Sequence, residues 1–214
     1  MKRTFFSLAL LLAVATLTAQ TKMTAREAAV KIADRILAST TYEFKNTKTG
    51  EIYKSVKKLP LDMDVKVACK YNNWHYTNGV TNMALMELGD KLGDKKYEKY
   101  VLKNMNFVFN EGNLDFFRKQ YDEAFKRDGW NAVRKLSWHM IFRGKRLDDN
   151  GPMGASLIEL QLKYPNDSFL GYINETAEHL NYGEPRLVDG TIARIWPHVN
   201  TIWADDAFLS LIHI

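Results

Sequence analysis

Apolar residues recur every three or four positions along most of this chain, and that period limits the possible fold more than any other feature. Four stretches carry it: Val80, Ala84, Leu88 and Leu92; Tyr97, Val101, Met105 and Val108; Leu114, Phe117, Tyr121 and Phe125; and Phe169, Ile173, Ala177 and Leu180. Neither a convincing strand alternation nor a Rossmann-type glycine pattern is found beside them. The sequence therefore predicts an all-α fold.

The first helix is expected over residues 24–38. Thr24 stands at the N-cap and Glu27 three residues later, which is the spacing of a capping box. The apolar face of this helix consists of Ala28, Ile32, Ile36 and Leu37. Its start is thus predicted by the cap as well as by the period.

Further helices are expected near residues 130–142, 152–163 and 167–181. Short turns between helices of this length suggest stacked helical hairpins. Residues 41–73 contain Gly50 and Pro60 and are interpreted as a connector with at most a short helix. Residues 182–200 are interpreted as a long loop that leads into another helix.

Residues 1–19 predict an N-terminal signal peptide. Lys2 and Arg3 precede an apolar run at residues 5–17, and cleavage is expected after Ala19. The run is short for a transmembrane anchor. We therefore expect a secreted or periplasmic protein without a membrane anchor.

Charge and cysteine content exclude several classes of function. Removing residues 1–19 lowers the formal net charge from +5 to +3, and no basic block with interleaved aromatic residues indicates a nucleic-acid partner. Cys69 is the only cysteine, so no intrachain disulfide forms, and no cysteine and histidine spacing indicates zinc. His75, His139 and His179 are interpreted as structural.

Two pairs of aspartates stand in otherwise apolar sequence. One pair is Asp148 and Asp149, and the other is Asp205 and Asp206 close to the last residue. Carboxylates are seldom buried unless they are paired or functional. The two pairs therefore predict a carboxylate-based active site.

Three motifs occur in order along the chain. The first is Trp-His-Tyr-Thr-Asn-Gly-Val at residues 74–80, and the second is Leu-Asp-Asp-Asn-Gly-Pro-Met-Gly-Ala at 147–155. The third consists of Asp-Gly-Thr-Ile-Ala-Arg at 189–194 and Asn-Thr-Ile-Trp-Ala-Asp-Asp at 200–206. Together they resemble the unsaturated rhamnogalacturonyl hydrolases of glycoside hydrolase family 105, over roughly residues 24–208.

This resemblance implies an (α/α)6 toroid whose inner helices line a bowl, with the active site at their N-terminal ends. It also implies a hydrolase without metal or organic cofactor that acts late in pectin degradation. The substrate is the unsaturated uronyl end left by a polysaccharide lyase. An acid protonates C4 of the C4=C5 double bond, water adds at C5, and the resulting hemiketal collapses and releases the neighbouring sugar.

The resemblance also assigns roles to the aspartates. Asp205 matches the general acid/base, and Asp148 matches the second aspartate of the site. Two like charges in a water-poor bowl would favour one protonated carboxyl group. Asp149 and Asp206 are placed in the site as well and remain the alternatives within each pair. Helix N-capping is the structural explanation for the same residues.

Five more residues are candidates for binding the substrate. Arg194 has the forked guanidinium that suits a carboxylate, although it could equally be a surface arginine. Trp74, Trp196 and Trp203 offer flat rings for stacking on a sugar, although tryptophans at helical spacing are more often core residues. His198 stands near the predicted acid and could hydrogen-bond the substrate or lie in solvent.

Two parts of the chain depart from the family pattern. Asn150 and Pro152 stand where Cys and Ala are more usual, and Pro152 is tolerated if it lies in the first turn of a helix. The helices that would complete a toroid are not found after the third motif. Residues 209–214 fit the codons CTG TCT CTT ATA CAC ATC, which resemble the end of a transposase-based sequencing adapter. We therefore expect residues 20–208 to be the N-terminal part of the domain and 209–214 a non-native tail, with a natural C-terminus as the alternative.

Three functions remain open from the sequence. The first is removal of an unsaturated galacturonyl residue from rhamnogalacturonan fragments. The second is the related removal of an unsaturated glucuronyl residue from glycosaminoglycan-type fragments. The third is a helical toroid that binds sugar without turnover, or an inactive fragment. The sequence does not indicate an oligomeric state.

Overall fold

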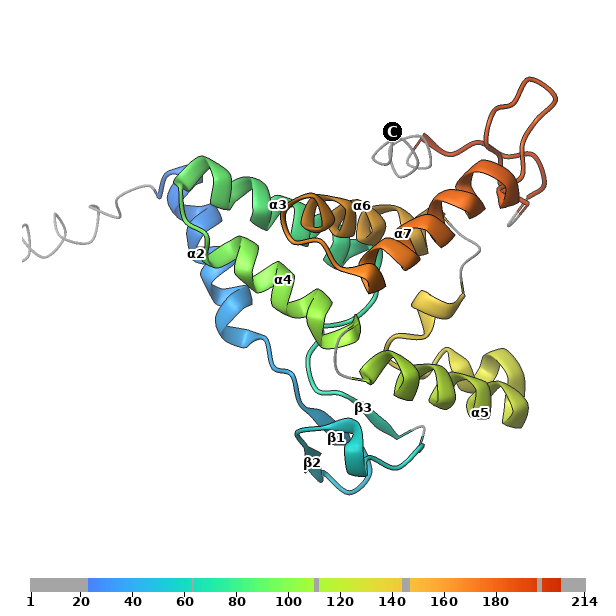
Figure 1. The fold of residues 1–214 in the computed structure, drawn as a ribbon, viewed down its shortest axis with the longest axis horizontal. Coiled ribbons are helices and arrows are strands. Elements are labelled where there is room, and N and C mark those ends of the chain that lie inside the picture. The colour runs from blue at the N-terminus through green and yellow to red at the C-terminus, as the bar shows by residue number, and fades with distance from the viewer. Residues whose placement is uncertain (1–22, 63, 110–111, 144–146, 196–197, 205–214) are drawn as a thin grey trace, which may run out of the picture. The chain divides into compact units, whose positions relative to one another are not determined.

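The computed structural model describes residues 23–62, 64–109, 112–143, 147–195 and 198–204 (Figure 1). Within these ranges the chain is mostly helical, which confirms the predicted class of fold. The described residues fall into two units, which divide between Arg35 and Ile36. Several predictions lie outside the described residues: the signal peptide at 1–19, Trp196, Asp205, Asp206 and the tail at 209–214.

Helix α2 (Ala25–Ser39) begins at the predicted capping box. The backbone N–H of Thr24 donates to Oε2 of Glu27 at 2.8 Å, and the backbone N–H of Glu27 donates to Oγ1 of Thr24 at 3.2 Å. This reciprocal pair satisfies N–H groups that have no partner within the helix. The predicted apolar face is wrong at Ile32, whose side chain is exposed.

Helices α3 (Tyr76–Leu92) and α4 (Lys96–Phe109) form the first helical hairpin. Gly93, with a left-handed φ of 67°, ends α3, and Tyr97 at the start of α4 lies close to Gly89 near the end of α3. Phe109 at the far end of α4 meets Trp74 just before α3, at 6.1 Å between ring centroids. The two helices are therefore antiparallel. All four positions predicted for the core in α4 are buried: Tyr97, Val101, Met105 and Val108.

Helices α6 (Leu147–Lys163) and α7 (Asp167–Glu178) form the second hairpin. Tyr172 of α7 donates its hydroxyl hydrogen to Oδ1 of Asn150, near the start of α6, at 2.9 Å. Leu180 lies in η3 (His179–Gly183), a π-helical turn that directly follows α7, and it shares a buried cluster with Leu147. Because Leu180, just after the end of α7, meets Leu147 at the start of α6, the second hairpin is also antiparallel.

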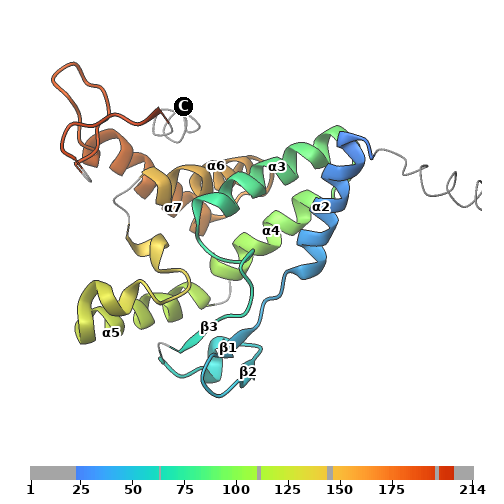
Figure 2. The same cartoon turned by 180° about the vertical axis from the view of Figure 1, so that it is seen from behind.

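The first helices of the two hairpins, α3 and α6, lie side by side and run in the same direction (Figures 1 and 2). Near their N-terminal ends, Gly79 lies against Pro152 and Met153. At their C-terminal ends, Nζ of Lys163 lies 3.6 Å from Oδ2 of Asp90. The N-terminal ends of α3 and α6 therefore meet on one side of the molecular unit that contains them.

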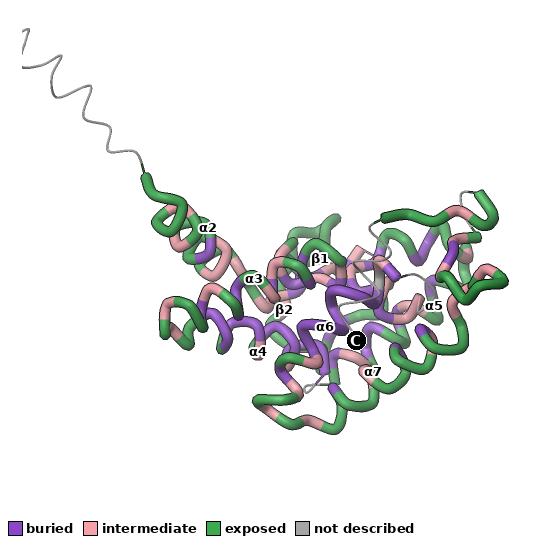
Figure 3. Tube along the Cα trace, turned by 90° about the horizontal axis from the view of Figure 1, so that it is seen from above, coloured by how far each residue is buried: buried purple, intermediate pink, exposed green. Residues whose placement is uncertain are grey.

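The contact with α6 uses a face of α3 that its apolar period does not predict. Val80 is exposed, whereas the buried positions are Asn78, Gly79, Asn82, Leu85, Met86 and Gly89. A Cβ atom placed on Gly79 would lie 2.4 Å from the carbonyl carbon of Pro152, so the backbones of the two helices are in direct contact there. Residues 151–157 of α6 are all buried (Figure 3). Close packing against α6 thus requires a residue without a side chain at position 79, which the apolar period does not predict.

Residues 41–73 contain a small antiparallel sheet that the sequence did not predict. Its strands are β1 (Phe44–Asn46), β2 (Ile52–Tyr53) and β3 (Val65–Val67), in the order β2-β1-β3. Phe44 pairs with Tyr53 on one side and with Val67 on the other. The short helix expected in this connector is the 3₁₀ turn η1 (Val56–Lys58). Strands of two or three residues are too short to show an alternating pattern.

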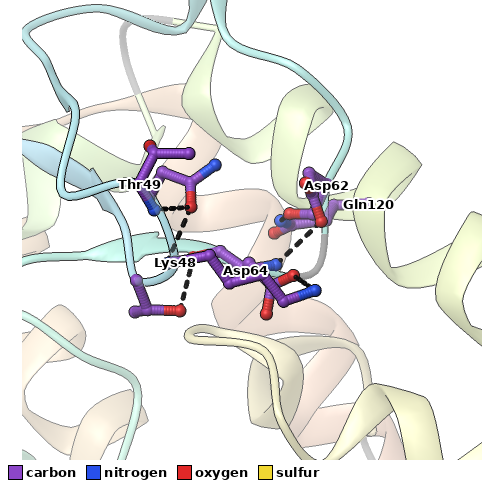
Figure 4. Close-up of polar contacts among 7 residues, drawn as sticks. Lys48, Thr49, Asp62, Asp64 and Gln120 are labelled. Carbon is purple, nitrogen blue, oxygen red and sulfur yellow. Dashed lines mark hydrogen bonds and ion pairs between the residues drawn. The ribbon is translucent and has the colours of Figure 1, made fainter.

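Gln120 of helix α5 (Asn113–Val133) joins this sheet to the helices (Figure 4). Its Nε2 donates to the backbone oxygens of Asp62, at 2.6 Å, and Val65, at 3.1 Å. The connector is further held by Nζ of Lys48, which lies 2.5 Å from Oδ2 of Asp64. A buried amide that satisfies two carbonyl groups fixes where β3 lies against α5.

The helix expected at residues 130–142 is interrupted, which corrects the prediction. Helix α5 kinks at Asp128 and Gly129, where Gly129 has a φ of 51° and a ψ of −136°, and it ends at Val133. The 3₁₀ turn η2 (His139–Phe142) follows after Trp138, whose φ is 47°. Gly129 permits a backbone conformation that breaks the helix, a use of glycine that helical period alone does not predict.

Aromatic rings form the centre of the core. Phe117 and Trp138 stack with centroids 5.5 Å apart, and Trp138 lies 6.2 Å from Trp74. Trp74 in turn meets Tyr172 edge-on at 4.9 Å, and Phe44 of the sheet lies 6.0 Å from Phe117. The ring contacts therefore connect the sheet, α5 and the two helical hairpins. No helix in the described part of the chain is long and apolar enough to cross a membrane.

We predict that Gly79→Ala destabilises the protein by about 1–3 kcal/mol, because its Cβ would overlap the backbone of α6. The matched control is Gly171→Ala in α7, where a Cβ meets nothing within 4 Å. The control is expected to stabilise by about 0.5–1 kcal/mol, since alanine favours a helix interior. Urea unfolding of the three proteins measures both effects. Equal stability of Gly79→Ala and wild type would contradict the close approach of α3 and α6.

A second prediction concerns Glu98, which joins α4 to the end of α6. Its Oε2 lies 2.7 Å from Nζ of Lys163, and its Oε1 accepts a hydrogen bond from Tyr164 at 2.5 Å. These two partners hold the pKa of Glu98 below its ordinary value. A lowered pKa in the folded state stabilises the protein above the pKa of an unfolded glutamate, about 4.3, and the effect is lost as the pH falls through the lowered value.

We therefore expect Glu98→Gln to lower the free energy of unfolding by about 1–3 kcal/mol at neutral pH. The difference from wild type should shrink as the pH is lowered from about 5 to about 3. Glu87→Gln, which breaks the exposed pair between Glu87 and Lys91, is the control and should have little effect. Urea unfolding as a function of pH tests this, and a pH-independent difference for Glu98→Gln would count against it.

Candidate active site

Asp148 is the second residue of α6, so its carboxylate lies at the positive end of the helix dipole. One of its oxygens, Oδ1, accepts a hydrogen bond from Nη2 of Arg194 at 3.0 Å. The side chains of Asp148 and Arg194 are 30% and 16% exposed, so the ion pair is partly shielded from water. Two predicted site residues that stand 46 positions apart in the sequence are thus in direct contact.

Pro152 lies inside α6 and not in its first turn, which corrects the predicted start of the helix. The helix begins at Leu147, five residues before Pro152. Proline has no N–H, so the backbone oxygen of Asp148 receives no helical hydrogen bond from position 152. The second motif therefore forms the first turns of α6 and not a turn ahead of it.

The predicted loop at residues 182–200 is folded locally as a hairpin in its described part. Arg186 and Ile192 form an isolated antiparallel bridge, and the backbone N–H of Leu187 donates to the oxygen of Thr191 at 2.8 Å. Gly190, with a φ of 86°, closes the turn. Oδ1 of Asp189 accepts from the backbone N–H of Thr191 at 3.0 Å, and this bond lowers the pKa of Asp189.

This hairpin is attached to the start of α6. Ile192 packs against the buried pair Leu147 and Leu180, and Nη2 of Arg186 donates to the backbone oxygen of Leu180 at 2.9 Å. Ala193, the residue before Arg194, is buried. The packing of Ile192 on Leu147 and Leu180 therefore positions Arg194 at the N-terminal end of α6, where Asp148 lies.

A second backbone bridge brings Trp203 to the same place. The backbone N–H of Arg194 donates to the oxygen of Thr201 at 2.8 Å. The guanidinium carbon of Arg194 then lies 4.1 Å from the ring centroid of Trp203, which is close enough for a cation–π interaction. Trp203 remains 41% exposed. Asp148, Arg194 and Trp203 form one connected cluster, which we call the Asp–Arg–Trp cluster.

Trp74 does not belong to this cluster, which corrects its predicted role. Its side chain is only 1% exposed and lies among Phe109, Trp138 and Tyr172. A ring enclosed in this way has no face on which a sugar can stack. Trp74 is a core residue.

The first motif reaches the site through its glycine instead. Gly79 lies against Pro152 and Met153 of the second motif, four and five residues after Asp148. Asn150, noted in the sequence only as a departure from the family pattern, is buried and accepts the hydrogen bond from Tyr172. Apart from the polar character of Asn150, no feature of the sequence predicts this pair.

The histidines take different positions. His198 is exposed, and its backbone oxygen accepts a hydrogen bond from Oγ1 of Thr201 at 2.8 Å. His75 caps α3, because its Nδ1 accepts from the backbone N–H of Thr77. Among the described residues, no group of three or more His, Cys, Asp or Glu side chains is arranged to hold a metal ion.

The predicted acid lies just beyond the described residues. The structure describes the chain up to Ala204, so the positions of Asp205 and Asp206 are not part of it, and the side chain of Asp149 is also outside it. Trp203, two residues before Asp205, is the last predicted site residue that is placed.

No protein-family model matches the chain, and no curated protein matches it either. The resemblance to glycoside hydrolase family 105 therefore depends on the three motifs alone. Those motifs are in contact with one another: Gly79 with Pro152, and Asp148 with Arg194.

We predict that Asp148 and Arg194 are energetically coupled. A double-mutant cycle with Asp148→Asn and Arg194→Gln should give a coupling free energy of about 1 kcal/mol, because the pair is partly buried. Arg186→Gln is the control, since Arg186 donates to the backbone oxygens of Leu180 and Gly190 and pairs with no carboxylate among the described residues. Asp148→Asn combined with Arg186→Gln should be additive within about 0.5 kcal/mol. Additivity in both cycles, measured by urea unfolding, would exclude the ion pair.

Proposed function

We propose that this chain is part of an exported glycoside hydrolase that removes a terminal unsaturated galacturonyl residue from lyase-generated pectin fragments. One observation carries the proposal. Residues of three motifs that are far apart in the sequence meet at the N-terminal ends of α3 and α6, through Gly79 with Pro152 and Asp148 with Arg194. An accidental match of three short motifs would give no reason for them to meet.

The arrangement of the helices supports an (α/α)6 toroid as the proposed fold of the whole domain. In such a ring the inner helices are parallel to one another, and each is followed by an antiparallel outer helix. The pairs α3 with α4 and α6 with α7 have this relation, and α3 and α6 are parallel neighbours. We propose that α3 and α6 are inner helices. The remaining helices of the ring would belong to a longer protein.

The Asp–Arg–Trp cluster suits an unsaturated uronate in three ways. The Arg194 guanidinium can donate in forked geometry to the substrate carboxylate while it also donates to Asp148. The half-exposed ring of Trp203 offers an apolar surface to the sugar. The N-terminal ends of α3 and α6 add positive dipole ends, which favour an anionic substrate.

In the proposed reaction Asp205 is the proton donor. Asp148 already accepts a hydrogen bond from a guanidinium, which is a role for a carboxylate and not for an acid. In the sequence, Asp205 follows by two residues Trp203, whose ring lies beside the Arg194 guanidinium. Asp205 protonates C4 of the substrate and then, as a base, activates the water that adds to C5. The hemiketal opens and the neighbouring sugar leaves.

The experiment follows the loss of the unsaturated-uronate absorbance on two lyase-generated disaccharides, one from rhamnogalacturonan and one containing glucuronate. It uses this chain and also the longer protein that the toroid implies. We expect faster loss on the rhamnogalacturonan disaccharide. Asp205→Asn should lower kcat by about 10²–10⁴-fold, the usual contribution of a general acid.

The control variant is Asp206→Asn, which alters the adjacent carboxylate and should keep most of the activity. Loss of activity in Asp206→Asn with retention in Asp205→Asn would move the acid to Asp206. No loss of absorbance on either disaccharide would refute the hydrolase assignment. Unchanged binding of the disaccharides in that case would favour a toroid that binds sugar without turnover.

A further inference from the structure

Helix α5 carries a group of aromatic and arginine side chains that the proposed active site does not use. Tyr121 and Phe125 lie with parallel ring planes, 2° apart, at 6.4 Å between centroids, and Trp130 meets Phe125 edge-on at 6.0 Å. Phe142 of η2 meets Tyr121 at 5.6 Å. Two guanidinium groups accompany the rings. The full group, which we call the α5 aromatic face, is Arg118, Tyr121, Phe125, Trp130, Phe142 and Arg143.

The face is open to solvent although its rings are large. Phe125 is 47% exposed and Trp130 is 52% exposed. The kink at Asp128 and Gly129 lies between these two residues, at the point where the chain turns from the first part of α5 to the second. Contiguous exposed apolar surface of this kind commonly marks an interaction site.

Arginines lie over the rings instead of around them. The guanidinium carbon of Arg118 lies 4.5 Å from the ring centroid of Phe142, and that of Arg143 lies 5.8 Å from the ring centroid of Trp130. Apolar rings and positive charge therefore occupy the same surface. A ligand that covers it must present apolar and anionic groups close together.

The net charge of the chain is concentrated in this region. Residues 118–143 contain seven basic residues (Lys or Arg) and three acidic residues (Asp or Glu). The rest of the chain contains 23 basic and 22 acidic residues. The formal excess of +5 for the whole chain thus comes almost entirely from 26 residues. This distribution complements an anionic partner.

We propose that the α5 aromatic face binds an anionic polysaccharide chain of the polyuronate class. Each uronate unit has an apolar ring face, which suits Phe125 and Trp130, and a carboxylate, which suits the guanidinium groups of Arg118 and Arg143. The proposal needs only the contacts of α5 and η2 and does not depend on the proposed hydrolase activity. The surface would bind the polymer along its length.

Two other anionic partners fit the face less well. A membrane surface would require the rings to enter the boundary of the acyl chains, and the guanidinium groups that lie over the rings would have to follow them out of water. A nucleic-acid backbone carries charge far more densely, and it would meet Asp122, Glu123 and Asp128 among the cations. A polyuronate has one charge per sugar and tolerates those acids.

Affinity electrophoresis of the full chain in gels that contain polygalacturonate tests the proposal. We expect retardation that weakens with added salt, and an increase of about tenfold or more in Kd for Phe125→Ala combined with Trp130→Ala. Arg118→Gln combined with Arg143→Gln should weaken binding similarly and reduce its salt dependence. Tyr182→Ala and Arg26→Gln, which alter an exposed aromatic residue and an exposed arginine outside the face, should leave the Kd unchanged.

Circular dichroism is used to check that each variant is folded. Trp130→Leu, which keeps an apolar side chain without a ring, serves as the second variant. Dextran, single-stranded DNA and anionic lipid vesicles are tested under the same conditions. Absence of polygalacturonate binding, equal binding to dextran, or tighter binding to DNA or vesicles would overturn the proposal. So would a Kd that the variants of the face leave unchanged. The hydrolase assay has no part in any of these outcomes.

Discussion

The direct contact between the backbones of α3 and α6 is the constraint on which the candidate site depends. Gly79 has no side chain, so the backbone of α6 can approach it without steric conflict. Pro152 has no backbone N–H, so the contact leaves no donor of Pro152 without a partner. The contact brings the N-terminal ends of both helices together, and Asp148 lies at one of them. If the helices were held apart by a methyl group, the first two motifs would no longer adjoin.

A second level of structure rests on that contact. The hairpin that begins at Pro185 reaches the start of α6 because Ile192 packs on Leu147 and Leu180. Arg194 follows directly and pairs with Asp148, and its backbone holds Thr201. The ion pair between Arg194 and Asp148 therefore depends on the packing of Ile192, and that packing depends on the position of α6. The chemistry proposed for the cluster requires each of these levels.

The sequence predicted those features in which side-chain pattern and environment agree. Helix α4 was predicted with its buried positions, because one regular apolar stripe, including Tyr97 and Val101, faces the core. The capping box at Thr24 and Glu27 was also predicted, since its hydrogen bonds are local.

The predictions from the sequence were wrong or incomplete where contacts between distant segments determine which residues are buried. Helix α3 was predicted, but not its buried face, because the close approach of α6 requires a glycine at position 79 and leaves Val80 exposed. Trp74 was expected near the substrate, and the aromatic core encloses it instead. The pairing of Asp148 with Arg194 joins distant segments, so spacing in the sequence contained no information about it.

The reaction proposed for this site adds water to a double bond in the sugar and does not attack the glycosidic bond directly. Nuclear magnetic resonance of the reaction in D₂O, with a lyase-generated disaccharide as substrate, distinguishes the two. For hydration we expect the vinyl proton signal at C4 to disappear in step with release of the neighbouring sugar, and one deuterium to enter at C4. Release of the neighbouring sugar while the vinyl signal remains would rule out hydration.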